Sequence, residues 1–443
     1  MIDNKTDGRM ENQDLASVLG TDRDQPMAPV PLEERQHWMA PAMIFGGLEF
    51  CIPILMVGGT LAGSFRLSHI LLLLFVGLVL IQWPGNAFGG YIGAKLGLSS
   101  SVIARKSFGN AQARLVVGGI IFIACLGWWA VQTAVAGNAL CAMLNIDYKT
   151  QKMAWMLITT IVGFTFAAPS IIGYSSMKWT DYVAVPAGLI LVCVGIFLAL
   201  RNVGLSAMLD WTPQPTMSFL TALSLVISMN VSQWVIASDY TRYARPVVRD
   251  NLLIPIGIVG VGFPLFFVGA VMSIGVGTGD IVQVMLNLGF PVWGFIVLYL
   301  STWTSQLVNN YTMGLALANL LNVQSGRGRA MVTFVGTVIA IVVALAGILD
   351  HFMDFLFMTA LVYPCIAGII FADFLLPGGD KWVNTPGWRW EATVAMFGGV
   401  ALGYVTQYLY NWGIPAVQSM FFSLALYWVC AKLREANLVV EKG

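Results

Sequence analysis

Apolar stretches about as long as a membrane-spanning helix follow one another along most of this chain. A helix needs roughly 20 apolar residues to cross the hydrocarbon core of a bilayer. Only 10% of the residues are Asp, Glu, Lys or Arg, compared with about a quarter in soluble domains. The sequence therefore predicts an all-α polytopic membrane protein with about 12 transmembrane helices, at residues 39–64, 70–92, 115–141, 153–173, 182–200, 217–238, 252–277, 289–321, 330–349, 352–375, 390–409 and 415–431.

Little apolar sequence remains outside these spans, although 58% of the 443 residues are hydrophobic. This excludes a large soluble catalytic domain, and a net charge of +1 gives no reason to expect a nucleic acid partner. The six cysteines stand singly without CxxC spacing. Neither a disulfide framework nor a zinc site is predicted, and no cofactor is expected.

The ends of the chain and the loops predict the orientation. Residues 1–38 contain eight acids and four bases without an apolar period, which is typical of a disordered cytoplasmic tail and not of a signal peptide. Fifteen of the 23 lysines and arginines fall in loops on the side of the carboxyl tail, and four fall on the opposite side. Because cytoplasmic loops retain basic residues, we expect both termini, including a tail at 432–443, on the cytoplasmic side of the inner membrane.

Two spans contain residues that disfavour a continuous helix. The first span has Glu49 and Pro53 near its middle, between the pairs Gly46-Gly47 and Gly58-Gly59. The sixth span carries four polar residues, namely Ser228, Asn230, Ser232 and Gln233. Interrupted helices in corresponding positions of two halves indicate a transporter built from inverted repeats, with its site near the midplane. The alternative interpretation is close helix packing mediated by glycine.

The third span offers a surface for a flat ligand. Trp128 and Gln132 are four residues apart and share one helix face. An indole ring beside an amide suits a planar heterocycle, because the ring stacks and the amide both donates and accepts hydrogen bonds.

The eighth span is dense in hydroxyl and amide side chains between residues 301 and 311. Ser301, Thr304 and Ser305 share one face, and Gln306 and Asn310 share a neighbouring one. Uncharged hard oxygens are suited to a weakly held alkali cation, so this span predicts a cation site beside a patch of amides.

Glu49 is a carboxylate at mid-membrane, where an ionisable residue is a functional hypothesis by default. Three roles remain open: a hydrogen bond to the amidine edge of a heterocycle, proton exchange, or a structural pair with a distant base. Asp239, near Arg242 and Arg245 at the end of the sixth span, is interpreted as a gate or a helix-end ion pair.

Short motifs along residues 38–432 resemble the nucleobase:cation symporter-1 family, also called the purine-cytosine permease family. The motifs lie in the same order as in the family and include Gly58-Gly-Thr-Leu61, Gly89-Gly-Tyr-Ile-Gly-Ala-Lys95, Ala104-Arg-Lys-Ser-Phe-Gly109, Gly127-Trp-Trp129, Ser238-Asp-Tyr-Thr-Arg-Tyr243, Trp303-Thr-Ser305, Gly314-Leu-Ala-Leu-Ala-Asn319 and Pro364 through Asp373.

The resemblance implies a five-plus-five inverted repeat with broken helices 1 and 6, over residues 39–200 and 217–375, and two extra helices over 390–431. It also implies uptake of a nucleobase such as cytosine or a purine with sodium. Sodium would be bound by the carbonyls of Gly47, Phe50 and Ser301 and the hydroxyls of Thr304 and Ser305. Substrate would stack on Trp128 and contact Gln132, Gln306 and Asn310.

One position in the sixth span departs from the family. Where other members have an aromatic residue nine positions before the aspartate, this chain has Asn230. Trp234 could complete the stack from one turn further on, or Asn230 could bond a more polar ligand alongside Gln233 and Glu49.

Several functional alternatives stay open. The substrate could be a related heterocycle, such as hydroxymethylpyrimidine or an allantoin-like or hydantoin-like ring, and a proton could replace sodium. A membrane-embedded enzyme would need HExxH, GxSxG or clustered Cys and His, and a channel would show charge rings or a carbonyl filter. Neither pattern occurs, so we expect a transporter and not an enzyme, with the oligomeric state undetermined.

Overall fold

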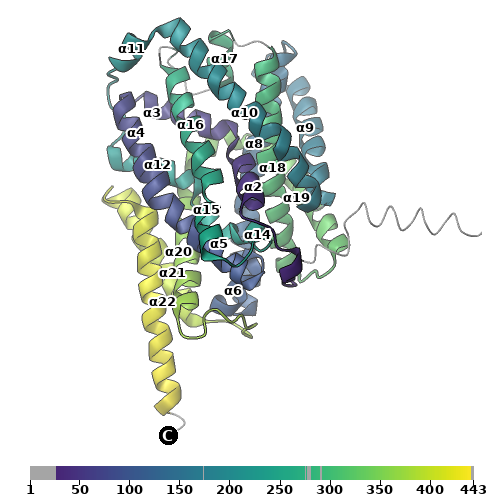
Figure 1. The fold of residues 1–443 in the computed structure, drawn as a ribbon, viewed down its shortest axis with the longest axis vertical. Helices are drawn as coiled ribbons and strands as arrows, with labels where there is room; N and C mark the ends of the chain where they lie inside the picture. The colour runs from purple at the N-terminus through teal and green to yellow at the C-terminus, as the bar shows by residue number, and fades with distance from the viewer. Residues whose placement is uncertain (1–25, 173, 275, 277–280, 290–291, 441–443) are drawn as a thin grey trace, which may run out of the picture.

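The structure, a computed structural model, describes residues 26–440 apart from 173, 275, 277–280 and 290–291. These described residues form a bundle of helices without a β-strand, apart from one isolated bridge between Gln36 and Ala244 (Figure 1). The predicted all-α fold class is confirmed.

The first half of the chain forms helices that include two π-helical stretches, η2 and η3, and the 3-10 helix η1. The elements are η1 (Leu32–Glu34), α2 (Met39–Glu49), α3 (Ile52–Ala62), α4 (Leu67–Leu74), η2 (Phe75–Gln82), α5 (Trp83–Leu96), α6 (Ser100–Phe108), α7 (Asn110–Gln112), η3 (Ala113–Val117), α8 (Gly118–Met143), α9 (Lys152–Ile172) and α10 (Tyr174–Val203).

The second half contains the 3-10 helix η4 and a third π-helical stretch, η5. The elements are α11 (Leu205–Leu209), α12 (Phe219–Asn230), α13 (Gln233–Ile236), α14 (Ser238–Thr241), α15 (Val248–Leu253), α16 (Ile256–Ser273), α17 (Ile281–Asn287), α18 (Val292–Leu321), α19 (Gly326–Leu345), η4 (Ile348–His351), α20 (Phe352–Leu375), α21 (Trp390–Tyr404), η5 (Val405–Leu409) and α22 (Pro415–Val440). Figure 1 shows α22 at the edge of the bundle, beside α20 and α21, with which it packs.

Among the described residues, nine helices are long and apolar enough to cross a membrane, or ten if the bent pair α2 and α3 counts as one span. The predicted span 182–200 falls within α10, and the predicted span 289–321 includes all of α18. The count of twelve stays a prediction.

The first span breaks at its middle, as its sequence predicts. α2 ends at Glu49 and α3 begins at Ile52, with a bend of 58° between them. Phe50 has φ −70° and ψ 75°, the inverse γ-turn conformation, and the amide of Cys51 donates to the Glu49 carbonyl at 2.7 Å. Pro53 has no N–H, so it fits only the first turn of the new helix.

The break in the sixth span is milder than expected. α12 ends at Asn230 and α13 begins at Gln233, but Val231 and Ser232 keep right-handed helical dihedral angles. The path of the helix is therefore almost continuous while the hydrogen-bond ladder is interrupted.

Glycines bring two pairs of helices into close contact. A Cβ atom at Gly58 of α3 would lie 2.1 Å from the Phe266 carbonyl oxygen of α16. A Cβ atom at Gly89 of α5 would lie 2.1 Å from the Trp234 carbonyl oxygen of α13. The close-packing interpretation therefore holds for Gly58, and the break lies earlier in the span.

The predicted cytoplasmic tail differs from the expectation in its second part. Residues 1–25 lie outside the described residues, whereas 26–38 are hydrogen-bonded to the ends of the helices. The Val30 amide donates to the Gly97 carbonyl at 2.9 Å, and the Gln36 amide donates to the Tyr243 carbonyl at 2.6 Å. The described part of the predicted carboxyl tail continues α22 to Val440.

Candidate functional site

A small polar cavity lies at the break of the first span. Its volume is about 20 Å³, room for about one water molecule. Its lining comes from α2, the break, α3, α8, α12, the α12–α13 break, α13 and α18, namely Leu48, Glu49, Cys51, Ile54, Trp128, Gln132, Met229, Asn230, Ser232, Gln233, Ser305 and Asn309. Residues from spans far apart in the sequence thus meet at one point near the middle of the bundle.

Glu49 and Asn230 form the polar centre of this cavity. The Asn230 amide Nδ2 donates to Glu49 Oε2 at 3.1 Å, and Glu49 is 0% exposed. A Cβ atom on Gly262 of α16 would lie 2.6 Å from Oε2, so a side chain there would displace the carboxylate from its present position. The sequence predicted both Glu49 and Asn230 as site residues, but it did not predict the hydrogen bond between them.

Several polar atoms of the cavity have no hydrogen-bond partner among the described residues. They are Glu49 Oε1, Gln132 Oε1, Gln233 Oε1 and Ser305 Oγ. A buried polar atom without a partner costs about 1–3 kcal/mol, and such atoms in a cleft are suited to bind a ligand.

Trp128 lines one wall of the cavity, as expected for a stacking surface. Its ring contacts Phe352 and Phe355 edge to face, with centroid distances of 6.2 and 5.4 Å. These contacts fix the plane of the indole, because edge-to-face pairs favour one relative orientation.

The predicted cation ligands come from both sides of the same junction. The Thr304 hydroxyl donates to the Gly47 carbonyl at 3.0 Å and so joins α18 to the last turn of α2. Ser305 follows Thr304 and faces the cavity. Phe50 lies in the break itself, and Ser301 lies in α18 with its side chain outside the described residues. Neutral carbonyl and hydroxyl oxygens are the ligands that an alkali cation prefers.

Three predicted substrate contacts do not reach the cavity. The Trp234 indole lies over α5, where a Cβ atom on Gly85 would be 2.5 Å from Trp234 Nε1. The Gln306 amide donates to the Thr133 hydroxyl at 2.6 Å. The Asn310 amide donates to the Ser170 hydroxyl at 2.8 Å. These side chains hold helices together and do not line the cavity, so the expected stack on Trp234 and the substrate contacts of Gln306 and Asn310 stay predictions.

The structure adds two residues that the sequence interpretation missed. Asn309 of α18 lines the cavity, and its position four residues after Ser305 on the same helix face could have indicated it. The Gln82 amide, at the end of η2, donates to the carbonyl of Asn230, where the ladder of the sixth span is interrupted. No local pattern identifies Gln82, because its partner is far away in the sequence.

Several motifs of the family resemblance are joined by hydrogen bonds at α6. Asp239 Oδ1 accepts from the Ser100 amide at 2.7 Å and from its hydroxyl at 2.8 Å, so it caps α6. Its role as a gate or a helix-end ion pair stays a prediction. Arg105 Nε donates to Asn319 Oδ1 at 2.9 Å, and the Tyr427 hydroxyl donates to Asp373 at 2.8 Å. These contacts tie α6 to α14 and α18, and α22 to α20.

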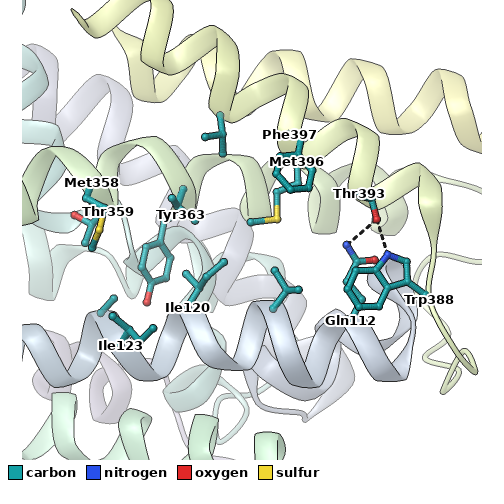
Figure 2. Close-up of a pocket in the computed structure, with 14 residues that line it drawn as sticks. Gln112, Ile120, Ile123, Met358, Thr359, Tyr363, Trp388, Thr393, Met396 and Phe397 are labelled. Atoms are coloured by element: carbon teal, nitrogen blue, oxygen red, sulfur yellow. Dashed lines mark hydrogen bonds between the residues drawn. The ribbon is translucent and has the colours of Figure 1, made fainter.

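A larger groove of about 430 Å³ lies on the flank between α8, α20 and α21 (Figure 2). No charged residue is among its described lining residues, and Ile123 and Phe397 on its rim are 56% and 72% exposed. At one end, Gln112 and Trp388 both hydrogen-bond to the Thr393 hydroxyl, at 3.0 and 2.7 Å. Its apolar lining distinguishes this groove from the polar cavity.

The chain is similar to known proteins over most of its length. Residues 29–429 match the family described as permeases for cytosine/purines, uracil, thiamine and allantoin. The chain is 26% identical over 397 residues to the cytosine permease of Escherichia coli K12, covering 87% of this chain and 90% of that protein. It is 25% identical over 365 residues to the purine-cytosine permease FCY2 of Saccharomyces cerevisiae, covering 73% of this chain and 67% of that protein.

Solved structures have the same fold. The nucleobase-cation-symport-1 transporter Mhp1, closed with bromovinylhydantoin bound, superposes with a TM-score of 0.77 at 19% identity, covering 92% of this chain and 94% of that one. A Na⁺-coupled sialic acid symporter gives a TM-score of 0.66 at 13% identity, covering 90% of each chain. At these identities the likeness establishes the fold alone.

Proposed function

This chain belongs to the family of permeases for cytosine and purines, uracil, thiamine and allantoin, and we propose that it imports a nucleobase such as cytosine or a purine by cation symport, with sodium as the coupling ion. As a member of this family it is a multi-pass membrane transporter of small nucleobase-type substrates, not an enzyme. We assign it to the cytoplasmic (inner) membrane with both termini in the cytoplasm, the orientation that its basic loops favour.

The contact between the broken first helix and α18 is the observation that carries this proposal. Thr304 donates to the carbonyl of Gly47, two residues before Glu49. In the proposed sodium site, the Thr304 and Ser305 hydroxyls and the carbonyls of Gly47, Phe50 and Ser301 bind the ion. Sodium would therefore order the last turn of α2, from which Glu49 enters the cavity.

The heterocycle would bind in the adjoining cavity. Trp128 supplies the stacking face, and Gln132, Asn230, Gln233 and Glu49 supply polar groups around its edge. At about 20 Å³ the cavity is much smaller than a nucleobase, so these walls must separate for substrate to enter. Alternating access requires such a movement.

Helix packing indicates which elements would move together. α3 contacts α16 closely at Gly58, and α5 contacts α13 closely at Gly89. Because a side chain at either glycine would clash with backbone, each pair is expected to move as one body against α8 and α18. Sodium and substrate would then each raise the affinity of the other, since coupling between two sites is reciprocal.

Uptake into proteoliposomes tests this function. Labelled cytosine is offered with and without an inward sodium gradient, in competition with purines, uracil, ureides and hydroxymethylpyrimidine. Sodium-driven uptake that unlabelled cytosine or a purine blocks would support the proposal. Absence of uptake, together with absence of binding by any of these compounds, would refute the nucleobase assignment.

A second candidate is symport of a related nitrogen heterocycle, such as hydroxymethylpyrimidine or an allantoin-like or hydantoin-like ring, coupled to a proton. The buried Glu49–Asn230 pair favours this candidate, because it places a carboxylate that could exchange a proton beside an amide, at a position where cytosine-type and hydantoin-type members have an aromatic side chain. Counterflow in vesicles separates a carrier from a channel or an enzyme: a carrier exchanges labelled for unlabelled substrate, and an enzyme alters the compound.

A further inference from the structure

The polar cavity has an unusual balance of charge. Among its described lining residues, Glu49 is the single carboxylate, and no Lys, Arg or His is present. Glu49 is fully buried, and among the described residues one hydrogen bond reaches it, from the Asn230 amide to Oε2. A buried carboxylate is stable only when hydrogen bonds or opposite charge replace its lost hydration, and here Oε1 has neither among the described residues.

The remaining unpartnered atoms around the cavity are also mainly acceptors. Gln132 and Gln233 each have a buried carbonyl oxygen, Oε1, without a donor in the described structure. The Glu49, Gln132 and Gln233 side chains, from α2, α8 and α13, therefore line one small cavity, and each has an acceptor oxygen without a donor in the described structure. A ligand that satisfies Glu49 Oε1 must present an N–H group to it, because an oxygen lone pair there would repel the carboxylate.

The carboxylate is also held in place. Asn230 fixes Oε2 from α12, and Gly262 lets α16 pack directly behind the carboxylate without a side chain in between. An acceptor oxygen fixed in this way discriminates strongly, because the ligand group that faces it must be a donor and a small movement of the side chain cannot avoid that group.

Resting on the proposed function, we propose that Glu49 determines substrate specificity, and that the site selects heterocycles with an amino group next to a ring nitrogen, an amidine or guanidine edge, over their oxo counterparts. The exocyclic NH₂ donates to Glu49 Oε1 while the ring stacks on Trp128. Exchange of amino for oxo replaces the exocyclic NH₂ by an oxygen with lone pairs and, in cytosine and adenine, moves a hydrogen to the adjacent ring nitrogen, so that Oε1 faces an acceptor where it had faced a donor. Adenine, guanine and cytosine carry such an edge, whereas hypoxanthine, xanthine and uracil carry oxygen there.

Matched pairs of bases test the proposal on the unaltered protein. The purified transporter is titrated with cytosine and uracil, adenine and hypoxanthine, and guanine and xanthine, with binding followed by thermal stabilisation and by competition against labelled cytosine uptake. In each pair of which a member binds, the amino base is expected to bind at least about tenfold more tightly than its oxo counterpart. The reason is that the oxo base cannot form the hydrogen bond to Glu49.

The variant Glu49→Gln separates the carboxylate from the rest of the site. An amide both donates and accepts, so the preference for the amino member should fall to within about threefold. Glu391→Gln is the matched control, because Glu391 pairs with Arg434 at 3.1 Å outside the cavity and its loss should leave the preference unchanged. If Glu49→Gln does not fold, Glu49→Asp keeps the charge and should weaken amino members while they remain preferred.

The outcomes are distinct. Oxo members that bind as tightly as their amino partners would overturn this inference and leave the transporter function standing. A Glu49→Gln variant whose sodium requirement changes while its amino preference persists would also overturn it, because the carboxylate would then serve the ion. If no base of either kind binds, the proposed function itself fails, and the inference fails with it.

Discussion

Replacement of Thr304 by alanine tests the proposed sodium site most directly. The Thr304 side chain is fully buried, and its hydroxyl donates to the Gly47 carbonyl at 3.0 Å across the junction of α18 and α2. Thr304 is not among the residues that line the substrate cavity, whereas its neighbour Ser305 is. The substitution should therefore affect the ion much more than the choice of substrate.

The size of the effect follows from this contact. Loss of the hydroxyl leaves the Gly47 carbonyl without this donor in a buried position, which costs about 1–3 kcal/mol. Loss of the methyl group removes a further ~0.8 kcal/mol of apolar burial. Loss of one oxygen ligand should weaken sodium binding by about 1.5 kcal/mol or more, or roughly tenfold.

Uptake measured over a series of sodium concentrations provides the assay. In Thr304→Ala, the half-saturating sodium concentration should rise about tenfold, and substrate affinity should recover at high sodium because coupling is reciprocal. The ratio of cytosine to uracil uptake should change less than about twofold, because the cavity wall is intact.

Two companion variants make the result interpretable. Thr304→Ser keeps the hydroxyl and should retain near-normal sodium dependence. Thr165→Ala makes the same change on an exposed face of α9, where the hydroxyl bonds only the carbonyl of Ile161 one turn back, and should have no effect. A folded Thr304→Ala protein with an unchanged sodium requirement would falsify the ion assignment.

Three further substitutions test the other parts of the site. Trp128→Ala should weaken substrate binding by about 1–3 kcal/mol, the strength of base–aromatic stacking; equilibrium binding that stays within about twofold would contradict the stacking role. Gln82→Ala removes the donor to the carbonyl of Asn230 and should lower thermal stability by about 1–3 kcal/mol, with Gln82→Glu failing to restore it. Gly89→Ala places a Cβ atom 2.1 Å from the Trp234 carbonyl oxygen, so it should reduce stability by about 1–3 kcal/mol and slow transport, which melting and initial uptake rates would reveal.

The membrane class and the broken first helix follow from the sequence alone. Each of these properties is encoded in a short run of consecutive residues. In hydrocarbon, a helix must satisfy its own backbone groups, so a span is recognisable from about 20 residues, and a turn at Phe50 beside Pro53 is recognisable from five or six. Glu49, Trp128 and Gln132 could be selected for the same reason, as polar or aromatic interruptions of apolar runs.

The tertiary structure decided which polar side chains face the cavity. α18 carries hydroxyl and amide residues around much of its circumference between Thr302 and Asn310, so its sequence has no single polar face. Packing fixed the rotation of the helix: Gln306 bonds α8 and Asn310 bonds α9, and Asn309 is left in the cavity. Neighbouring residues on a helix point about 100° apart, and only contacts between distant segments can select one of those directions.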